Sequence, residues 1–226
     1  MNVYVKNKKY TLDIKNAISG GEGSVYLLND IAFKIYHEKD KMIPLGKFKE
    51  LNKIKSDKVI KPEELIYNEK KELIGYTMKA IYNTVPLSRV ITTDYQNNNN
   101  ISHKDLITII TNIKNTLKDI HSDNCLVVDI NDSNILIDKQ LNAYFIDVDS
   151  YKTENYPATA LQEFAKDFKV KNYNFNELSD WFSFGLLSTK ILLGIHPFMG
   201  RWNKYKKREK QNSLEYRSLN NISIFN

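Results

Sequence analysis

The stretch that most constrains the fold of this chain runs from Val127 to Asp149 and reads VVDINDSNILIDKQLNAYFIDVD. It holds two apolar runs, 134–138 and 143–146, separated by a short polar turn. Such a pattern predicts a β-hairpin. The hairpin would bring together three oxygen-bearing side chains that flank its strands: Asp129, Asn134 and Asp147.

Oxygen-bearing side chains of this kind suit Mg²⁺, which prefers a few carboxylates completed by phosphate oxygens. The spacing alone leaves a second interpretation open. Asp and Asn are common in turns because their side chains hydrogen-bond the local backbone. A surface turn rich in these residues is therefore the alternative, and other parts of the chain have to decide between the two.

Length and composition are those of an ordinary globular protein. The chain has 226 residues, of which 42% are hydrophobic and 27% charged. This length allows one large domain or two small lobes that share a cleft. The net charge of +6 suits an anionic ligand such as a nucleotide, although many soluble proteins share it.

Cysteine usage and apolar patterning predict a cytoplasmic protein. Cys125 is the single cysteine, so an internal disulfide is impossible and a reducing compartment is expected. The first residues, MNVYVKNKKY, lack the apolar core of a signal peptide. No stretch approaches the roughly 18 consecutive apolar residues of a membrane span, so no span is expected.

A glycine-rich segment near the N-terminus is the second informative feature. Gly20, Gly21 and Gly23 are three of the eight glycines in the chain, and residues 1–36 around them have the pattern of β-strands. Glycines let a backbone approach phosphates closely and present its N–H groups. An ordinary hairpin turn would also use glycines, so the segment is informative mainly because Lys34 follows it in a strand.

Helical periodicity predicts two long buried helices. Apolar residues recur at helical spacing over 106–120, and Ser102 with Asp105 forms a capping signal before them. A second, strongly apolar helix covers 179–193 and stops at Gly194.

A shorter helix is predicted over 44–55, with Glu50 near its middle. Its expected buried face holds Leu45, Phe48, Leu51 and Ile54. Strands are predicted at 59–60, 65–67 and 73–81, the last of them as the inner edge strand of a sheet. A polar spacer is predicted at 96–100, and a helix at 159–168.

The order of these features resembles the protein kinase superfamily, nearer its divergent bacterial and phage members than its eukaryotic ones. The resemblance covers about residues 10–200. Asp-Trp-x-Ser-x-Gly at 180–185 and Gly-x-x-Pro-Phe at 194–198 are similar to the central helix of the large kinase lobe and its exit. The ordered residues that carry the resemblance, after the glycine-rich segment, are Lys34, Glu50, Asp129, Asn134, Asp147 and Asp180.

The resemblance implies an α+β, two-lobed protein kinase-like fold. A small antiparallel β lobe with one helix would bind the nucleotide and cover residues 1–81. A mainly helical catalytic lobe would cover residues 82–226, with its terminal helices short or missing. In such a lobe Asp180 would support the backbone of the catalytic loop.

The resemblance also implies ATP- and Mg²⁺-dependent phosphoryl transfer to a protein hydroxyl of the Ser/Thr type. Asp129 would orient the acceptor hydroxyl as the catalytic base, and Lys34 would bind phosphate oxygens. Asn134 and Asp147 would hold Mg²⁺. The residues expected to bind or position ATP are Ile18, Gly20, Gly21, Glu22, Gly23, Val25, Ala32, Lys34, Glu50, Met78, Lys79, Ile81 and Leu136. The protein substrate is not identified by the sequence.

Several positions depart from the kinase pattern. Val127-Val128 stands where kinases have His-Arg, and Asn131 stands where protein-phosphorylating kinases have Lys. Asp149 ends a motif that is usually Asp-Phe-Gly, and Glu163 is a poor candidate for the usual Ala-Pro-Glu motif. Two alternatives therefore stay open: a small-molecule kinase of the aminoglycoside or choline type, and a pseudokinase that acts as a binding module.

Two expectations concern partners and regulation. The basic run 201–210, with Trp202 and Tyr205, could contact an acidic partner or nucleic acid, but a solvated basic helix is the expected structure and nucleic acid is not an expected partner. Val128 lacks the guanidinium that anchors an activation-loop phosphate in many kinases. Activity is therefore expected not to need phosphorylation of Thr153, Tyr156 or Thr159.

Overall fold

The computed structural model of the chain describes residues 1–159, 166–170, 174–199 and 213–225. The chain divides into two compact units. The first unit holds residues 1–54 and 60–83, and the second holds residues 55–59 and 84–226. The chain thus leaves the first unit for a short segment after residue 54 and then returns to it.

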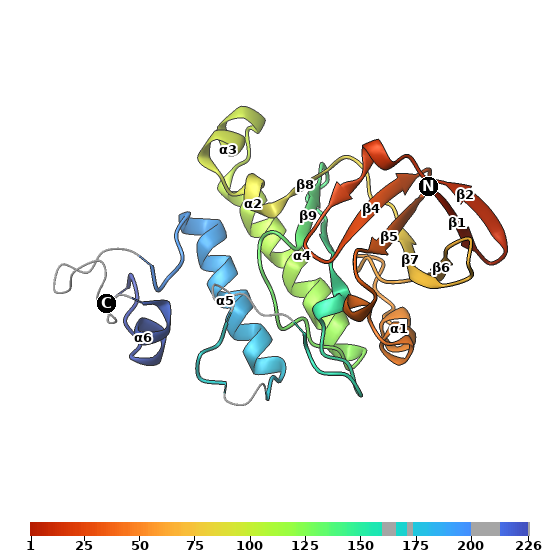
Figure 1. Ribbon diagram of the computed structural model, residues 1–226. Coiled ribbons are helices and arrows are strands. Elements are labelled where there is room, and N and C mark those ends of the chain that lie inside the picture. Colours follow the sequence, from red (N-terminus) through yellow and green to blue (C-terminus); the bar gives the residue numbers. More distant parts are fainter. Residues whose placement is uncertain (160–165, 171–173, 200–212, 226) are drawn as a thin grey trace. The chain divides into compact units, whose positions relative to one another are not determined.

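An antiparallel sheet of seven strands dominates the first unit, in the order β2-β1-β6-β7-β5-β4-β3 (Figure 1). Its strands are β1 (Asn2–Val5), β2 (Lys8–Thr11), β3 (Ile18–Ser19), β4 (Gly23–Leu28), β5 (Ile31–Tyr36), β6 (Glu64–Tyr67) and β7 (Leu73–Lys79). Two 3-10 helices, η1 (Ile14–Asn16) and η2 (Lys39–Lys41), follow β2 and β5. The predicted small antiparallel β lobe is confirmed.

The alternation of side chains along the strands gives this sheet two faces. On one face Phe33 of β5 is fully buried in a cluster with Val3, Val5, Leu12 and Ile66, so the N-terminal β1–β2 hairpin supplies much of the core. Strand β7 lies between β6 and β5. The expectation that this segment is an edge strand is therefore wrong, because β6 turns back and pairs along its other side.

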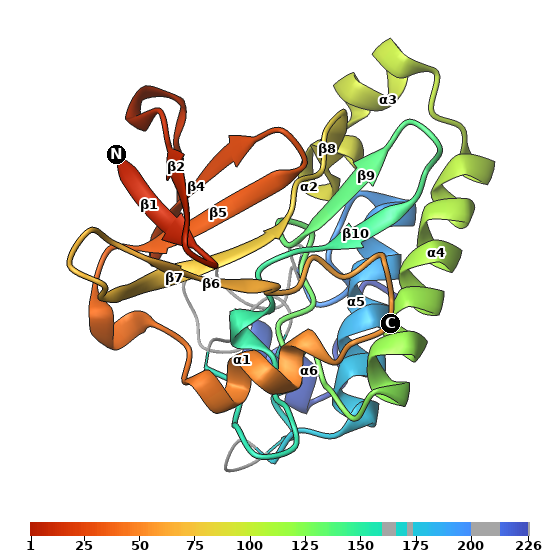
Figure 2. The same cartoon turned by 90° about the vertical axis from the view of Figure 1, so that its right-hand side faces the viewer.

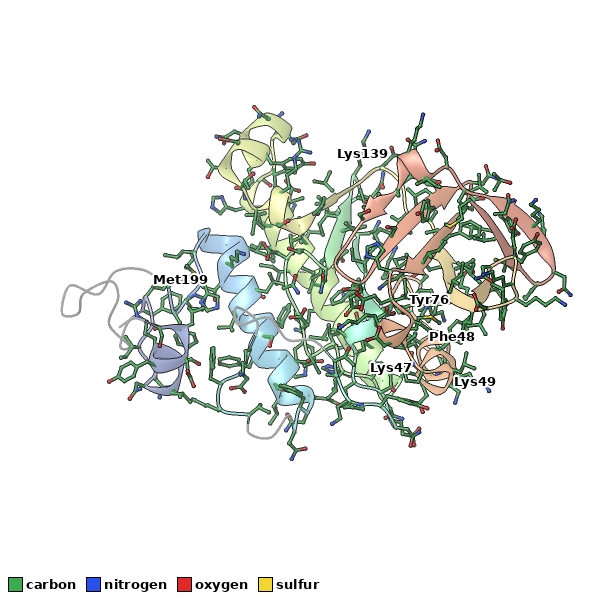
Figure 3. All side chains as sticks on the ribbon, viewed as in Figure 1. Lys47, Phe48, Lys49, Tyr76, Lys139 and Met199 are labelled. Carbon is green, nitrogen blue, oxygen red and sulfur yellow. The ribbon has the colours of Figure 1, made fainter. Side chains whose placement is uncertain are left out.

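Helix α1 (Leu45–Asn52) is the α-helix that the structure describes in the first unit, and it ends three residues earlier than predicted. Its buried residues are Lys47 and Leu51, whereas Leu45 is 50% exposed. The predicted buried face is wrong at Leu45 because positions 47, 51 and 54 also recur at helical spacing, and a lysine stem can be buried beside apolar neighbours. Phe48 packs edge-on against Tyr76 of β7 with ring centroids 6.5 Å apart (Figure 3).

The second unit combines helices with a sheet of three strands in the order β10-β9-β8. Its strands are β8 (Thr84–Pro86), β9 (Ile135–Asp138) and β10 (Ala143–Phe145). Its helices are α2 (Leu87–Val90), α3 (Thr93–Asn99), α4 (His103–Ser122), the 3-10 helix η3 (Val148–Ser150), α5 (Glu177–Leu193) and α6 (Leu214–Leu219). Figure 2 shows α4 and α5 side by side, and these two helices pack against each other.

Most of the predicted elements of this unit are confirmed. The predicted β9–β10 hairpin forms, with Phe145 opposite Ile135. Ser102 and Asp105 form a reciprocal capping box at the start of α4. Helix α5 ends at Gly194, which has a φ of 69° in the left-handed region that favours glycine.

Two predictions for the connecting segments are wrong. The polar spacer at 96–100 belongs largely to α3, because the side chain of Thr92 caps that helix by accepting from the N–H of Tyr95. Capping thus outweighs the low helix propensity of the Asn run. Residues 59–60 do not form the predicted strand. Val59 instead forms an isolated bridge to Phe145 within the second unit, to which the segment 55–59 belongs.

Three predictions fall on residues outside those that the structure describes. They concern Glu163, most of the helix at 159–168 and the basic run 201–210. Within the described ranges, no helix is both long and apolar enough to cross a lipid bilayer.

Candidate active site

The glycine-rich segment forms a tight turn between β3 and β4 in which Gly20, Gly21 and Glu22 are exposed. The N–H of Gly20 donates to the carbonyl of Gly23 over 2.8 Å. A Cβ on Gly23 would lie 2.5 Å from the carbonyl oxygen of Ile35, whereas a Cβ on Gly21 would meet nothing within 4 Å. Gly23 is therefore needed for the close approach of β4 to β5, and Gly21 leaves the edge of the turn open.

The strand register places five of the predicted ATP-binding residues on one face of the sheet. Residues paired across neighbouring strands point to the same face. One row across four strands consists of Ile18, Val25, Lys34 and Tyr76. Ala32 pairs with Met78 two positions along the same strands, so both share the face of Lys34.

Three other ATP-binding predictions, Lys79, Ile81 and Leu136, do not lie on this face. Lys79 follows Met78 on β7 and therefore points to the opposite face. Ile81 lies beyond the end of β7. Leu136 belongs to β9 of the second unit, where it pairs with Tyr144 and its side chain is half-buried.

Lys34 is a charged residue with only 8% of its surface exposed. Its Nζ lies 5.5 Å from the ring centroid of Tyr36 and 5.9 Å from that of Tyr76. Aromatic faces attract ammonium groups, and the attraction strengthens as water is removed. The two rings therefore help to hold a buried positive charge in a fixed place.

Helix α1 lies on the same face of the sheet as Lys34, because its Phe48 contacts Tyr76, the register neighbour of Lys34. Glu50 is half-buried on α1, one helical turn from Lys47. Lys47 is 1% exposed, which makes it the most deeply buried lysine described, and sequence reasoning missed it. The helical spacing between Lys47 and Leu51 is the feature of the sequence that indicates its burial. Lys47 and Lys49 lie on opposite sides of α1 (Figure 3).

In the second unit, the segment before Asp129 has a strained backbone. Val128 has a φ of 63°, and the N–H of Asp129 donates to the carbonyl of Val127 over 2.7 Å, which makes Val128 the centre of a γ-turn. A β-branched residue with positive φ is an outlier that costs about 1–3 kcal/mol, so surrounding contacts have to hold it.

Asp180 of α5 holds this strained segment. Its carboxylate accepts from the N–H of Val128 over 2.8 Å and from the N–H of Val127 over 2.9 Å. The same carboxylate lies 2.9 Å from Nε2 of His121, at the end of α4. Asp180 is fully buried. Its charge is thus balanced by two backbone donors and an imidazole, which is how a buried carboxylate is stabilised.

Asn131 organises the loop that carries Asp129. Its Nδ2 donates to the carbonyl of Asp129 over 3.1 Å and to the carboxylate Oδ2 of Asp129 over 3.0 Å. Its Oδ1 accepts from the N–H groups of Ser133 and Asn134. Asp129 and Asn131 are 4% and 5% exposed. In the sequence Asn131 stands out only as a departure from a pattern. The tendency of Asn side chains to bond backbone groups a few residues away is the signal that points to its role in the loop.

The structure brings Asp129, Asn134 and Asp147 together at the open end of the β9–β10 hairpin. Nδ2 of Asn134 lies 3.4 Å from Oδ2 of Asp129. The N–H of Ile146 donates to the carbonyl of Asn134 over 3.0 Å, which places the residue before β9 beside the residue after β10. Asp147 follows with a φ of 60°, in the left-handed region. Among the described residues, no three His, Cys, Asp or Glu side chains gather at a possible metal position.

Tyr151 lies close enough to Asp180 and Asp147 for their charges to affect it. Burial raises the pKa of its phenol well above the usual range, and the negative charges of Asp180 and Asp147 raise it further. Tyr151 is 1% exposed, and its hydroxyl has no hydrogen-bond partner among the residues that the structure describes. The phenol is therefore a buried neutral group beside two carboxylates.

Comparison with known proteins supports the fold. A solved structure of the kinase PK-1 of Cydia pomonella granulovirus matches with a TM-score of 0.66 at 15% sequence identity, covering 84% of this chain and 74% of that chain. No family model matches the chain, and no curated protein does. The match at this identity concerns the fold. The chain has a protein kinase-like α+β fold, with a small antiparallel β lobe that carries one helix and a mainly helical second lobe.

Proposed function

We propose that this chain catalyses ATP- and Mg²⁺-dependent transfer of a phosphoryl group to a protein hydroxyl. The observation that carries the proposal is the cluster of Asp129, Asn134 and Asp147 at the open end of one hairpin. The backbone before Asp129 is held in a strained conformation by the buried Asp180. Strained backbone that the surrounding structure over-determines is typical of functional sites.

The residues of the cluster fit Mg²⁺ by their chemistry. Asn134 donates its Nδ2 to Asp129, so its amide oxygen is directed to other contacts, and Asp147 supplies a carboxylate. Mg²⁺ is usually held by one or two such protein ligands and completed by phosphate oxygens and water. Asn134 and Asp147 would hold the ion, which when bound would neutralise charge on the phosphates.

The first unit would serve as the nucleotide-binding lobe. The open edge of the turn at Gly21 would let phosphate oxygens approach the backbone closely. Lys34 would supply a fixed positive charge to the phosphates, and Glu50 on α1 would hold its ammonium in place. Ile18, Val25, Ala32 and Met78 share the face of Lys34 and would give adenine an apolar surface.

Asp129 would accept a hydrogen bond from the acceptor hydroxyl and so orient it for attack. Its Oδ2 is occupied by the amides of Asn131 and Asn134, which fixes the direction of the carboxylate. A base held in one orientation lowers the entropic cost of reaching the reactive geometry.

Nucleotide binding tests the proposal before any acceptor is known. ATP with Mg²⁺ should raise the melting temperature, and at a ligand concentration about 100-fold above Kd the gain in unfolding free energy is about 2.7 kcal/mol. Asp147→Ala should remove the Mg²⁺-dependent part of the gain, whereas the control Asp94→Ala, at an exposed position on α3, should keep it. The absence of a shift with any nucleotide would instead favour a binding module without catalytic function.

One observation favours a second candidate. Asn131 carries no charge at the position where protein-phosphorylating kinases have a lysine, and this is compatible with a small-molecule kinase. Offering an aminoglycoside, choline and a generic protein as acceptors in parallel separates the two candidates. Transfer to a small molecule at a rate well above that to protein would replace the proposed acceptor class.

A further inference from the structure

Helix α5 contacts both ends of the loop that carries Asp129. At the start of the loop, the carboxylate of Asp180 accepts from the backbone N–H groups of Val127 and Val128. At the other end, Nζ of Lys190 lies 2.9 Å from the carboxylate Oδ2 of Asp132. The first contact joins a carboxylate to backbone N–H groups. The second contact joins two charged side chains.

The lengths of the two segments agree with this arrangement. Asp180 and Lys190 are ten positions apart on α5, which corresponds to about 15 Å along a helix axis. The five peptide steps from Val127 to Asp132 can span at most about 17 Å. The loop can therefore run along the helix between its two contacts.

Asp132 is also fixed through its backbone. Its carbonyl accepts from the N–H of Ser88, at the start of α2, over 3.0 Å. The next residues of the loop, Ser133 and Asn134, donate their N–H groups to Asn131. A displacement of Asp132 would thus move the same hydrogen-bond network that orients Asp129.

We propose that Lys190 is a positioning residue, which acts through Asp132 to hold Asp129 and Asn134 in the geometry for phosphoryl transfer. This inference rests on the proposed function for its catalytic consequence, but not for its structural one. The side chains of Lys190 and Asp132 are 34% and 17% exposed. A partly exposed ion pair contributes little to global stability. Small displacements of catalytic groups nevertheless reduce rates strongly.

The first experiment breaks and then rebuilds the pair. Lys190→Met and Asp132→Asn should each lower kcat by about tenfold or more while KM for ATP stays within about twofold, because the nucleotide contacts are unchanged. The double variant Lys190→Asp with Asp132→Lys restores opposite charges and should recover most of the lost kcat. The melting temperature of each variant should change by less than about 4 °C.

Lys55→Met provides a matched control, because Lys55 also forms an ion pair of the second unit, with Asp123 at 3.4 Å, through a side chain that is 87% exposed, but its partner lies outside the loop. This variant should keep the kcat of the wild type. If Lys190→Met keeps kcat as well, the inference is wrong. If it instead raises only the KM for the acceptor, Lys190 binds the acceptor and does not position the loop.

A second measurement separates this inference from the proposed function. Amide hydrogen exchange at Asp132, Ser133 and Asn134, measured without nucleotide, should accelerate in Lys190→Met and return toward the wild-type rate in the charge-reversed double variant. If exchange responds in this way but the wild type transfers no phosphate, the positioning contact stands and the proposed function fails. Unchanged exchange in Lys190→Met would overturn the contact itself.

Discussion

Tyr151 shows how a single buried group sets a dependence on pH. Burial, together with the charges of Asp180 and Asp147, raises the pKa of its phenol well above the usual value. The folded state therefore holds the phenolic proton more tightly than the unfolded state does. The resulting contribution to stability is complete below the unfolded pKa of about 10 and is lost as the pH rises through the folded value.

We predict that Tyr151→Phe changes the alkaline limb of the stability profile. The variant should lose less unfolding free energy than the wild type between about pH 9 and pH 11, because its unfolded state has no phenol at position 151 that can be stabilised by losing a proton. At pH 7 its stability should be unchanged or higher by about 1 kcal/mol, since the substitution removes a buried hydroxyl without a described partner. Melting temperatures across this pH range provide the measurement.

Tyr67→Phe is the matched control, because Tyr67 lies on β6 with 36% of its surface exposed. Its alkaline limb should follow that of the wild type. A Tyr151→Phe variant that unfolds at the same alkaline pH as the wild type would show that the phenol is not the group responsible.

At the residue scale, the sequence predicts which side chains meet but not how they are held. Asp129, Asn134 and Asp147 were predicted to converge, because a hairpin has one open end, and the structure brings them together. The role of Asn131 could not be predicted, because an Asn side chain can bond several backbone groups with similar energies. The positive φ of Val128 could not be predicted either, because β-branched residues disfavour it.

At the scale of the element, two glycines of the glycine-rich turn have different surroundings, which the sequence alone does not distinguish. Gly23 is required by packing, because a Cβ there would lie 2.5 Å from a carbonyl oxygen of β5. Gly21 has open space around its Cβ position. The two glycines should therefore respond differently to the same substitution.

We predict that Gly23→Ala lowers the melting temperature, because β4 has to move away from β5 to relieve the contact. Gly21→Ala should keep the melting temperature of the wild type. If the turn binds phosphate as proposed, Gly21→Ala should weaken ATP binding, because its methyl group would stand at the open edge of the turn. Thermal unfolding with and without ATP measures both effects. A loss of stability in Gly21→Ala equal to that in Gly23→Ala would contradict this division.

The segment after η3 carries the hydroxyls that could receive a regulatory phosphate. Thr153 is 3% exposed, and the hydroxyl of Thr159 donates to the carbonyl of Asp149. Val128 offers no guanidinium to pair with a phosphate. We therefore predict that phosphatase treatment leaves the initial rate of transfer unchanged. Replacing Thr153, Tyr156 and Thr159 by Val, Phe and Val should have the same outcome, and a loss of tenfold or more in both experiments would show that a phosphate switch exists.

Elements with strong periodicity were predicted well. Leu106, Ile109, Ile113, Leu117 and Ile120 are all buried on α4, as their spacing indicates. Short elements were predicted less well, because one hydrogen bond can decide them, as the Thr92 cap does for α3. Helix α1 is the intermediate case: its position was predicted, but its buried face includes Lys47, which composition does not suggest.

At the scale of the whole molecule, the order of the motifs predicted the fold even though no single motif was decisive. The match to the granulovirus kinase has a TM-score of 0.66 at only 15% identity, so the fold is shared where most side chains differ. In this chain a glycine-rich turn, a strand lysine and a polar hairpin end follow one another in that order. The pairing of β1 and β2 with the rest of the sheet was not predictable, because strand order depends on contacts between distant segments.

The central claim is phosphoryl transfer that depends on Asp129, and the most direct test follows the phosphate itself. The purified protein is incubated with Mg²⁺, a generic protein acceptor and ATP labelled on its γ-phosphate, and transfer of label is compared between the wild type and Asp129→Asn. We expect the wild type to transfer label and Asp129→Asn to lose about 10²-fold or more of the rate, with ATP affinity within a few-fold. Transfer by Asp129→Asn at a rate near that of the wild type, or none by the wild type, would contradict the account.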